Sequence, residues 1–363
     1  MCQTAAVTSR VKQMRPCHLS STAGRAGPAD RSRRLHVSRA PHSGLIFDCY
    51  AWDVAGINGG ERGETWRGRE GVRLRAFVRR AFGDERPKQF CPLLGPRSLL
   101  RQTLDRVGRL VPPARTVVVG VERHERYLDA ELGERPGPKV LKQPESRGTA
   151  AAVLLAAEWI AARDPHATVA FFPSDHFIRE EAVFVEHVAD VARFIRRQPG
   201  WLVLLGVPPS EPEPEYGWIE PGERVAWTGR APLYRVRRFV EKPAPELAQA
   251  LFRQGCFWNT LVFVSEVGAL LAAGRACVPS LAGRLGRLSA LWDGAREAGA
   301  VRRAYALAPT VNFSRAVLET CAQPVVVSSV PDLTWCDLGS PYRVLKTLAR
   351  SGIEVPWLAG ATA

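Results

Sequence analysis

The sequence predicts an α/β fold in which a mixed, mostly parallel sheet is covered by helices on both faces. Two observations lead to this prediction. From Leu99 onward, short apolar runs alternate with longer runs of helical periodicity, and such alternation gives right-handed crossovers between parallel strands. In addition, 46% of the 363 residues are hydrophobic, which is enough to bury a large core.

The chain before residue 210 shows this alternation most regularly. Each expected strand is a short run of apolar and β-branched residues, and each expected helix is a longer run with apolar residues three or four positions apart. The expected strands are 116–121, 168–172 and 201–207, and the expected helices are 99–111, 149–164 and 180–197.

After residue 207 the alternation is interrupted by turns rich in proline and glycine, around residues 211–222. It then resumes, with a helical region that reaches about residue 305. The remaining expected strands are 233–243, 260–265 and 323–330, and the remaining expected helices are 244–255 and 342–352. One domain is therefore expected over residues 45–350, followed by a short C-terminal tail at 351–363.

The first 44 residues differ from the rest of the chain. They are rich in arginine, serine, alanine and proline, and they show neither helical nor strand periodicity. We expect a disordered basic leader over residues 1–44, while an organellar transit peptide and an over-extended translation start remain open.

The net charge of +14 is concentrated in two stretches. Residues 1–44 carry eight Lys or Arg and one acid, and residues 67–80 carry six and one, so these stretches supply twelve of the fourteen charges. A nucleic-acid-binding domain needs positive charge on its folded surface, and the remainder of this chain is nearly neutral. No nucleic-acid partner is therefore expected.

Eight cysteines stand singly along the chain, without the spacing of a metal site. Reduced thiols are the simplest explanation, and they are typical of cytoplasmic proteins. No apolar run approaches the length of about 18 residues that spans a bilayer. We expect a cytoplasmic localisation with no membrane partner, and a homo-oligomer is compatible with the sequence.

Two aspartates follow apolar sequence and precede expected helices. Asp175 lies in "PSDH" and Asp337 lies in "TWCDLGS". Ligands of open α/β sheets bind where strands end, and two carboxylates brought together there form the oxygen site that Mg²⁺ prefers when it also holds phosphates. The alternative for Asp175 is a structural role, as the N-cap of the helix that begins near Arg179.

Two further segments are candidates for phosphate or nucleotide contacts. Lys88 follows a proline and is placed to meet a phosphate as a compact point charge, although it could equally be one of many exposed lysines. The "SRGTA" turn at 146–150 opens the longest expected helix, whose first N–H groups can receive an anion. Alternatively, Ser146 or Thr149 only caps that helix.

A third candidate group joins the end of one strand to the next. Glu241 and Asn259 are natural hydrogen-bonding partners for sugar hydroxyls, and Lys242 can hold a sugar phosphate. Because neighbouring residues on a strand face opposite sides, Glu241 and Lys242 can both serve one site only if the strand ends there.

Taken in order, seven motifs resemble those of the sugar-1-phosphate nucleotidyltransferases, and within that family those of the mannose-1-phosphate guanylyltransferases. The resemblance covers residues 68–347. The motifs are "PKQF" at 87–90, "QPESRGTA" at 143–150, "PSDH" at 173–176, "YGWIE" at 216–220, "FVEKP" at 239–243, "WNT" at 258–260 and "WCDLG" at 335–339.

The resemblance implies a Rossmann-like, GT-A-like nucleotidyltransferase domain. In such a domain a phosphate oxygen of mannose 1-phosphate attacks the α-phosphorus of GTP, with Mg²⁺ as the cofactor, and the products are GDP-mannose and pyrophosphate. The resemblance implies that Mg²⁺ is bound by Asp175 and Asp337, and that the catalytic residues at the phosphates are Arg73, Lys88 and Lys242. It places at the nucleotide Gly68, Gly71, Gln143, Gly148 and Thr149, and at the sugar Gly217, Glu241 and Asn259.

One part of the family pattern is altered. The family begins with an apolar strand that runs into a glycine-rich loop, whose amides hold the triphosphate. The nearest match is "GREGVRLRA" at 68–76, where Arg69 replaces a glycine and Ala76 replaces a proline. The apolar segment 44–60 can supply the first strand. The alternatives are another sugar specificity and a catalytically silent nucleotide-sugar-binding relative.

Overall fold

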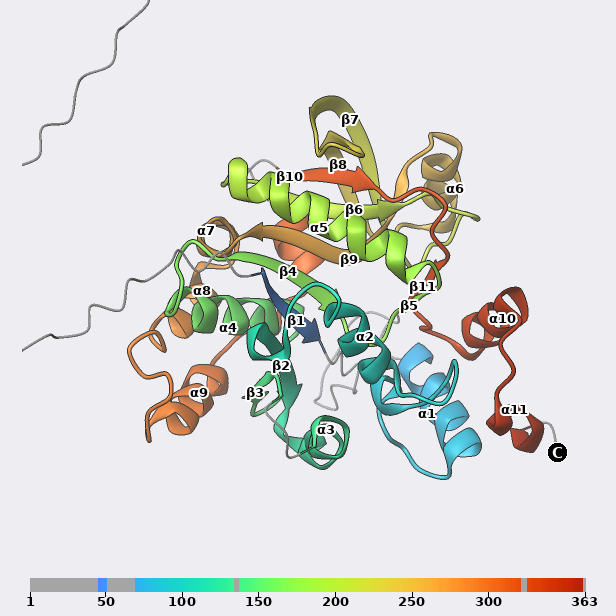
Figure 1. The fold of residues 1–363 in the computed structure, drawn as a ribbon, viewed down its shortest axis with the longest axis horizontal. Coiled ribbons are helices and arrows are strands. Elements are labelled where there is room, and N and C mark those ends of the chain that lie inside the picture. Colours follow the sequence, from blue (N-terminus) through green and yellow to red (C-terminus); the bar gives the residue numbers. More distant parts are fainter. Residues whose placement is uncertain (1–44, 51–68, 134–136, 321–324, 362–363) are drawn as a thin grey trace, which may run out of the picture. The chain divides into compact units, whose positions relative to one another are not determined.

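The computed structural model describes residues 45–50, 69–133, 137–320 and 325–361 (Figure 1). The expected leader at 1–44 and Gly68 lie outside the described residues. The described part of the chain contains no helix with both the length and the apolar composition needed to cross a bilayer.

Within these residues a nine-stranded sheet has the order β3-β2-β1-β4-β9-β6-β10-β8-β7. The strands β1 to β4, together with β6 and β10, run in one direction, and β9 is inserted antiparallel between β4 and β6. The predicted mixed α/β sheet is therefore confirmed. The strands are β1 (Leu45–Tyr50), β2 (Thr116–Val121), β3 (Lys139–Gln143), β4 (Thr168–Pro173), β6 (Leu202–Val207), β7 (Gly217–Trp227), β8 (Pro232–Glu241), β9 (Phe257–Glu266) and β10 (Val325–Ser329).

Helices cover both faces of the sheet, because alternate residues of the central strands point to opposite sides. Val169 and Phe171 of β4 pack toward one core, with α4 and α7 to α9, while Ala170 and Phe172 pack toward the other, with α2 and α5. The helices are α1 (Arg69–Phe82), α2 (Leu99–Val107), α3 (Glu125–Leu132), α4 (Thr149–Ala161), α5 (Glu181–Arg197), α6 (Pro245–Arg253), α7 (Val267–Cys277), α8 (Pro279–Gly286), α9 (Glu297–Ala306), α10 (Pro341–Ser351) and α11 (Pro356–Ala361).

The segment 44–60 supplies a central strand. β1 pairs in parallel with both β2 and β4, and Cys49 lies opposite Phe172 in the register. The expectation that this segment provides a strand is confirmed for residues 45–50, and residues 51–60 lie outside the described part.

The segment matched to the glycine-rich loop is helical instead. The expectation of a loop over residues 68–76 is wrong from Arg69 onward, since α1 begins there. The physical reason is the spacing of its apolar residues: Leu74, Phe77 and Val78 lie on one helical face and pack into a small core with α10. No proline interrupts the segment.

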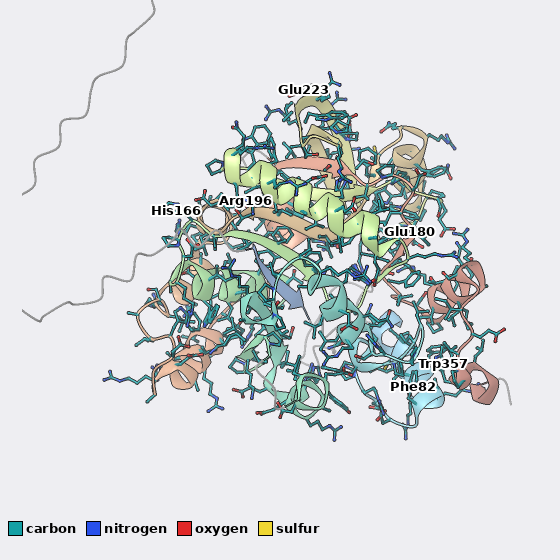
Figure 2. All side chains as sticks on the ribbon, viewed as in Figure 1. Phe82, His166, Glu180, Arg196, Glu223 and Trp357 are labelled. Carbon is teal, nitrogen blue, oxygen red and sulfur yellow. The ribbon has the colours of Figure 1, made fainter. Side chains whose placement is uncertain are left out.

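The last residues pack against this same helix. Trp357 of α11 contacts Phe77 of α1, with ring centroids 5.4 Å apart. It also contacts Phe82 of α1 at 5.9 Å, and Figure 2 labels these two side chains. The segment expected as a short tail at 351–363 therefore includes a helix, α11, with a packed aromatic side chain.

Candidate active site

A two-stranded ribbon brings Asp175 and Asp337 together. The strands β5 (Phe177–Ile178) and β11 (Trp335–Cys336) pair antiparallel, with Cys336 opposite Phe177. Asp175 precedes β5 by two residues and Asp337 follows β11 directly, so the pairing places both aspartates at the same end of the ribbon. Two segments more than 150 residues apart in the chain thus meet, as the sequence predicted.

Lys88 lies between the two aspartates. Its ammonium is 3.1 Å from Oδ2 of Asp175 and donates a hydrogen bond of 2.6 Å to the backbone carbonyl of Asp337. The alternative in which Lys88 is an exposed lysine is therefore wrong. The capping alternative for Asp175 is also wrong, because Glu180 occupies the N-cap position of α5 and Asp175 is 1% exposed.

The carboxylate of Asp337 is surrounded by donors. Its Oδ1 accepts from the backbone N–H of Gly339 at 2.9 Å and from the hydroxyl of Tyr216 at 3.2 Å, and Nη1 of Arg343 lies 2.9 Å from both carboxylate oxygens. Burial by itself would raise the pKa of Asp337, but Arg343 and then Lys88 outweigh it and hold that pKa below its ordinary value.

Arg343 was not among the residues predicted from the sequence. Its guanidinium lies over the ring of Tyr216, 4.6 Å from the centroid, and its Nη2 is 3.3 Å from Oε1 of Glu213. Burial by itself would lower the pKa of Arg343, but Asp337 and its other acidic neighbours outweigh burial and raise that pKa. A signal was present: Arg343 lies on the buried face of α10, next to Val344 and near Leu348.

The two aspartates differ as candidate metal ligands. Oδ1 of Asp175 is buried and has no hydrogen-bond partner among the described residues, and such an oxygen fits a cation. Nε2 of His176 lies 3.8 Å from it, and burial lowers the pKa of His176 to about 4. Asp337 does not fit as it stands, because both of its oxygens contact Arg343.

The three residues predicted at the sugar are close together. Gly217 opens β7 and pairs with Glu241 at the end of β8, and a Cβ added at Gly217 would lie 2.9 Å from Oε2 of Glu241 and 3.3 Å from Cβ of Asn259. Burial raises the pKa of Glu241. Nδ2 of Asn259 is buried without a hydrogen-bond partner in the described part of the chain. A polar ligand could therefore use both side chains.

Left-handed backbone occurs within two of the predicted motifs and directly after a third. Lys242, Leu261 and Leu338 have φ angles of 53°, 58° and 52°, a conformation that costs an L-residue roughly 1 kcal/mol or more. Lys242 directly follows Glu241, so β8 ends where the sequence argument required. The side chain of Lys242 then turns out to solvent, 3.6 Å from Glu215.

The residues predicted at the nucleotide form a separate group at the start of α4. The hydroxyl of Thr149 accepts from the N–H of Phe313 at 2.7 Å, and Oε1 of Gln143 accepts from the hydroxyl of Tyr305 at 3.0 Å. Gly148 is the N-cap residue, so the alternative in which Thr149 caps α4 is wrong. The preceding strand, β3, is separated from β4 by β2 and β1.

Gly71 and Arg73, also predicted from the resemblance, lie within helix α1. They therefore do not form a loop around a triphosphate. This part of the predicted constellation is not assembled as the resemblance implied.

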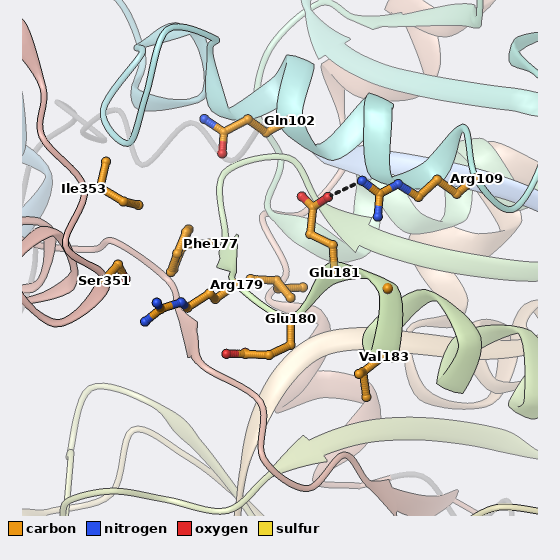
Figure 3. A pocket seen from close by; sticks show the side chains of 11 residues that line it. Gln102, Arg109, Phe177, Arg179, Glu180, Glu181, Val183, Ser351 and Ile353 are labelled. Carbon is orange, nitrogen blue, oxygen red and sulfur yellow. Dashed lines mark ion pairs between the residues drawn. The ribbon is translucent and has the colours of Figure 1, made fainter.

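A distinct pocket of about 560 Å³ lies beside β5 and the start of α5 (Figure 3). Phe177, Arg179, Glu180 and Glu181 contribute to its wall, and none of the predicted site residues does. Its acids are already paired: Glu181 lies 3.1 Å from Arg109, and Glu180 accepts from the N–H of Thr334 at 2.6 Å. Arg179, also in the wall, donates to the backbone carbonyl of Arg350 at 3.4 Å.

Comparisons with known proteins agree on one family. The family model described as nucleotidyl transferase matches residues 71–349. The xanthan biosynthesis protein XanB of Xanthomonas campestris pv. campestris (strain B100) is 33% identical over 294 residues, which cover 78% of this chain and 59% of that protein. A mannose-1-phosphate guanylyltransferase of Sinorhizobium fredii is 32% identical over 271 residues, which cover 71% of this chain and 50% of that protein. The chain thus spans only about half to three-fifths of these relatives.

Solved structures share this fold. A structure described as mannose-1-phosphate geranyltransferase from Thermus thermophilus has a TM-score of 0.62 at 28% identity, over 81% of this chain and 75% of that one. A structure described as mannose-6-phosphate isomerase from Helicobacter pylori has a TM-score of 0.58 at 22% identity, over 69% of this chain and 95% of that one, and it shows a shared fold. The predicted Rossmann-like, GT-A-like fold is confirmed.

Proposed function

The chain belongs to the nucleotidyl transferase family, among the sugar-1-phosphate nucleotidyltransferases, and we propose from this premise that it forms GDP-mannose and pyrophosphate from GTP and mannose 1-phosphate. The reaction class follows from the family. The choice of mannose and guanine rests on the relatives with that activity in their names.

One observation carries the proposal: a single ammonium, that of Lys88, contacts both Asp175 and Asp337. These residues come from three distant segments, and each belongs to a motif of the family. Tyr216 then connects Asp337 to Gly217, beside which Glu241 and Asn259 lie. These contacts support a single site that joins the two aspartates and Lys88 to the residues proposed at the sugar.

The chemistry needs alignment and charge neutralisation more than a protein nucleophile. A phosphate oxygen of the sugar phosphate forms a bond to the α-phosphorus of GTP, and the bond to the bridging oxygen breaks, so that pyrophosphate leaves with the electron pair. Lys88 supplies positive charge for these phosphates, and Lys242 would do so only after its side chain leaves Glu215 and turns toward the sugar phosphate. Glu241 and Asn259 orient the sugar through its hydroxyls.

The expected Mg²⁺ would be held by Asp175, whose Oδ1 is available. When bound, it would neutralise charge on the phosphates that it contacts. Asp337 acts differently in this proposal. Its carboxylate accepts hydrogen bonds from Tyr216 and Arg343, and its backbone carbonyl accepts one from Lys88.

The direct test incubates the purified full chain with GTP, mannose 1-phosphate and Mg²⁺ and follows pyrophosphate release. A matrix of the four common nucleoside triphosphates against mannose, glucose and other sugar 1-phosphates identifies the specificity. Turnover that is fastest with another pair corrects the substrates and leaves the reaction class. No release with any pair contradicts the proposed activity.

A second candidate function is a catalytically silent relative that binds a nucleotide sugar. Helix α1 favours it, since residues 69–76 are helical where the family has its phosphate-binding loop. Isothermal titration calorimetry with GDP-mannose separates the two functions. Binding of GDP-mannose without turnover supports the silent relative, and turnover excludes it.

A further inference from the structure

We propose that Arg343 withholds Asp337 from the divalent cation, so that Asp175 is the only one of the two aspartates that binds the metal directly. This inference rests on the proposed function for its relevance to catalysis. The metal-binding behaviour that it predicts can be measured without turnover.

The geometry of the pair carries the proposal. Nη1 of Arg343 lies 2.9 Å from Oδ1 and 2.9 Å from Oδ2 of Asp337, so one NH2 group of the guanidinium faces both carboxylate oxygens. Oδ1 also accepts from Gly339 and Tyr216, which gives it three donors. To bind Asp337, a metal ion would have to displace the guanidinium of Arg343, which is always charged. Most lone pairs of this carboxylate already accept hydrogen bonds.

Arg343 is also held in place from its other sides. Its guanidinium covers the face of Tyr216, and its Nη2 lies 3.3 Å from Glu213. Its side chain is 8% exposed. Residues 341–351 form α10, which the side chain of Ser340 caps, so the backbone that carries Arg343 belongs to a regular helix. The guanidinium is therefore a fixed part of the site.

Asp175 has the opposite environment. Its Oδ2 contacts Lys88, and its Oδ1 is a buried oxygen without a hydrogen-bond partner among the described residues. A buried carboxylate oxygen without a donor is unfavourable, and a cation would compensate for this. The two aspartates, which look equivalent in the sequence, thus differ in whether a carboxylate oxygen is available to a metal ion.

The task of Asp337 is to position its neighbours. Its carboxylate accepts from Tyr216, whose backbone leads into Gly217 at the sugar group, and its carbonyl accepts from Lys88. Asp337 and Arg343 are therefore positioning residues, while Asp175 contacts the metal.

The test is a titration of the nucleotide-free full chain with Mn²⁺ alone, followed by electron paramagnetic resonance of the free ion. Asp175→Asn should weaken Mn²⁺ binding by about ten-fold or more, and Asp337→Asn should change it less than about two-fold. Arg343→Met should strengthen binding by about ten-fold, because it frees a second carboxylate. Arg343→Met combined with Asp337→Asn should return to the wild-type affinity.

The control variant is Arg350→Met, an exposed position of the same helix, which should leave the affinity unchanged. Equal losses in Asp175→Asn and Asp337→Asn would overturn the proposal. An unchanged Mn²⁺ affinity in a folded Arg343→Met variant would also overturn it. The same holds if neither this variant nor the wild type binds Mn²⁺. Circular dichroism checks that each variant is folded, and absence of pyrophosphate release would bear on the proposed function alone.

Discussion

The hydroxyl of Tyr216 donates to Oδ1 of Asp337 across 3.2 Å, although the two residues are 121 positions apart in the chain. This contact connects the acid group to the strand that begins with Gly217. Burial, followed by the charge of Asp337, raises the pKa of Tyr216, so the hydroxyl keeps its proton and remains a donor. A substitution at Asp337 is therefore expected to shift Tyr216 and, through it, the position of Gly217 beside the proposed sugar site.

Replacing Lys88 with methionine should lower kcat/KM for pyrophosphate release by roughly 100-fold or more, because preorganised charge at transferring phosphates is lost. The matched control is Lys142→Met. Lys142 is an exposed lysine of β3, and it forms an ion pair with Glu125. It should retain activity within about two-fold. Equal activity of the folded Lys88 variant and the control would remove Lys88 from the site.

Replacing Gly217 with alanine should raise the KM for mannose 1-phosphate by about ten-fold, since one added methyl group in a fitted pocket is worth that much. The new Cβ would lie 2.9 Å from Oε2 of Glu241 and 3.0 Å from the ring of Phe239. The KM for GTP should stay within about two-fold. Steady-state kinetics with each substrate varied in turn measures both values.

Gly283→Ala is the control for this substitution, because its Cβ would meet nothing within 4 Å. It should leave both KM values unchanged. A Gly217 variant with an unchanged sugar KM, or with equal effects on both substrates, would contradict the placement of the sugar beside Glu241.

The strands that could be predicted are those whose burial is continuous. β4 and β6 are apolar on nearly every residue and buried throughout, so the sequence alone identifies them. β3 was missed because its lysines, Lys139 and Lys142, break the apolar run. β7 was missed because Pro221 and Gly222 read as a turn, whereas the strand accommodates them at irregularities in its pairing with β8.

The site was predictable where a motif gives both residue type and position. Asp175 and Lys88, for which the motifs imply a metal ion and a phosphate as ligands, lie in contact, and Glu241 and Asn259 lie together beside Gly217. Arg343 could not be assigned to Asp337 from the sequence, because that contact depends on how α10 packs after a left-handed residue, Leu338. Its occurrence on the apolar face of a helix was the only indication, and burial of a charge usually signals a partner.

Replacing Gly148 with alanine should lower the free energy of unfolding by roughly 3 kcal/mol, from backbone strain and steric conflict together. Gly148 has a φ of 79°, and an added Cβ would lie 2.2 Å from the backbone oxygen of Val311. Gly83→Ala is the matched control, since Gly83 also has a φ of 79° but open space around its Cβ. It should cost about 1 kcal/mol, from strain alone. Urea unfolding of both variants measures the difference, and equal losses would contradict the contact with Val311.

The buried histidine of α5 should make the fold sensitive to acid. Burial lowers the pKa of His187 from 6.5 to about 4, and its Nε2 lies 2.8 Å from Oγ of Ser328 on β10. Between these two pKa values the unfolded chain binds more protons than the folded one, so the free energy of unfolding falls as the pH drops from about 6.5 toward 4. Between pH 7 and pH 5 this one residue should account for a loss of about 2 kcal/mol. Urea unfolding at both pH values, for the wild type and for His187→Gln, measures this loss. The variant should lose about 2 kcal/mol less than the wild type over this interval. An identical loss would show that folding does not lower the pKa of His187.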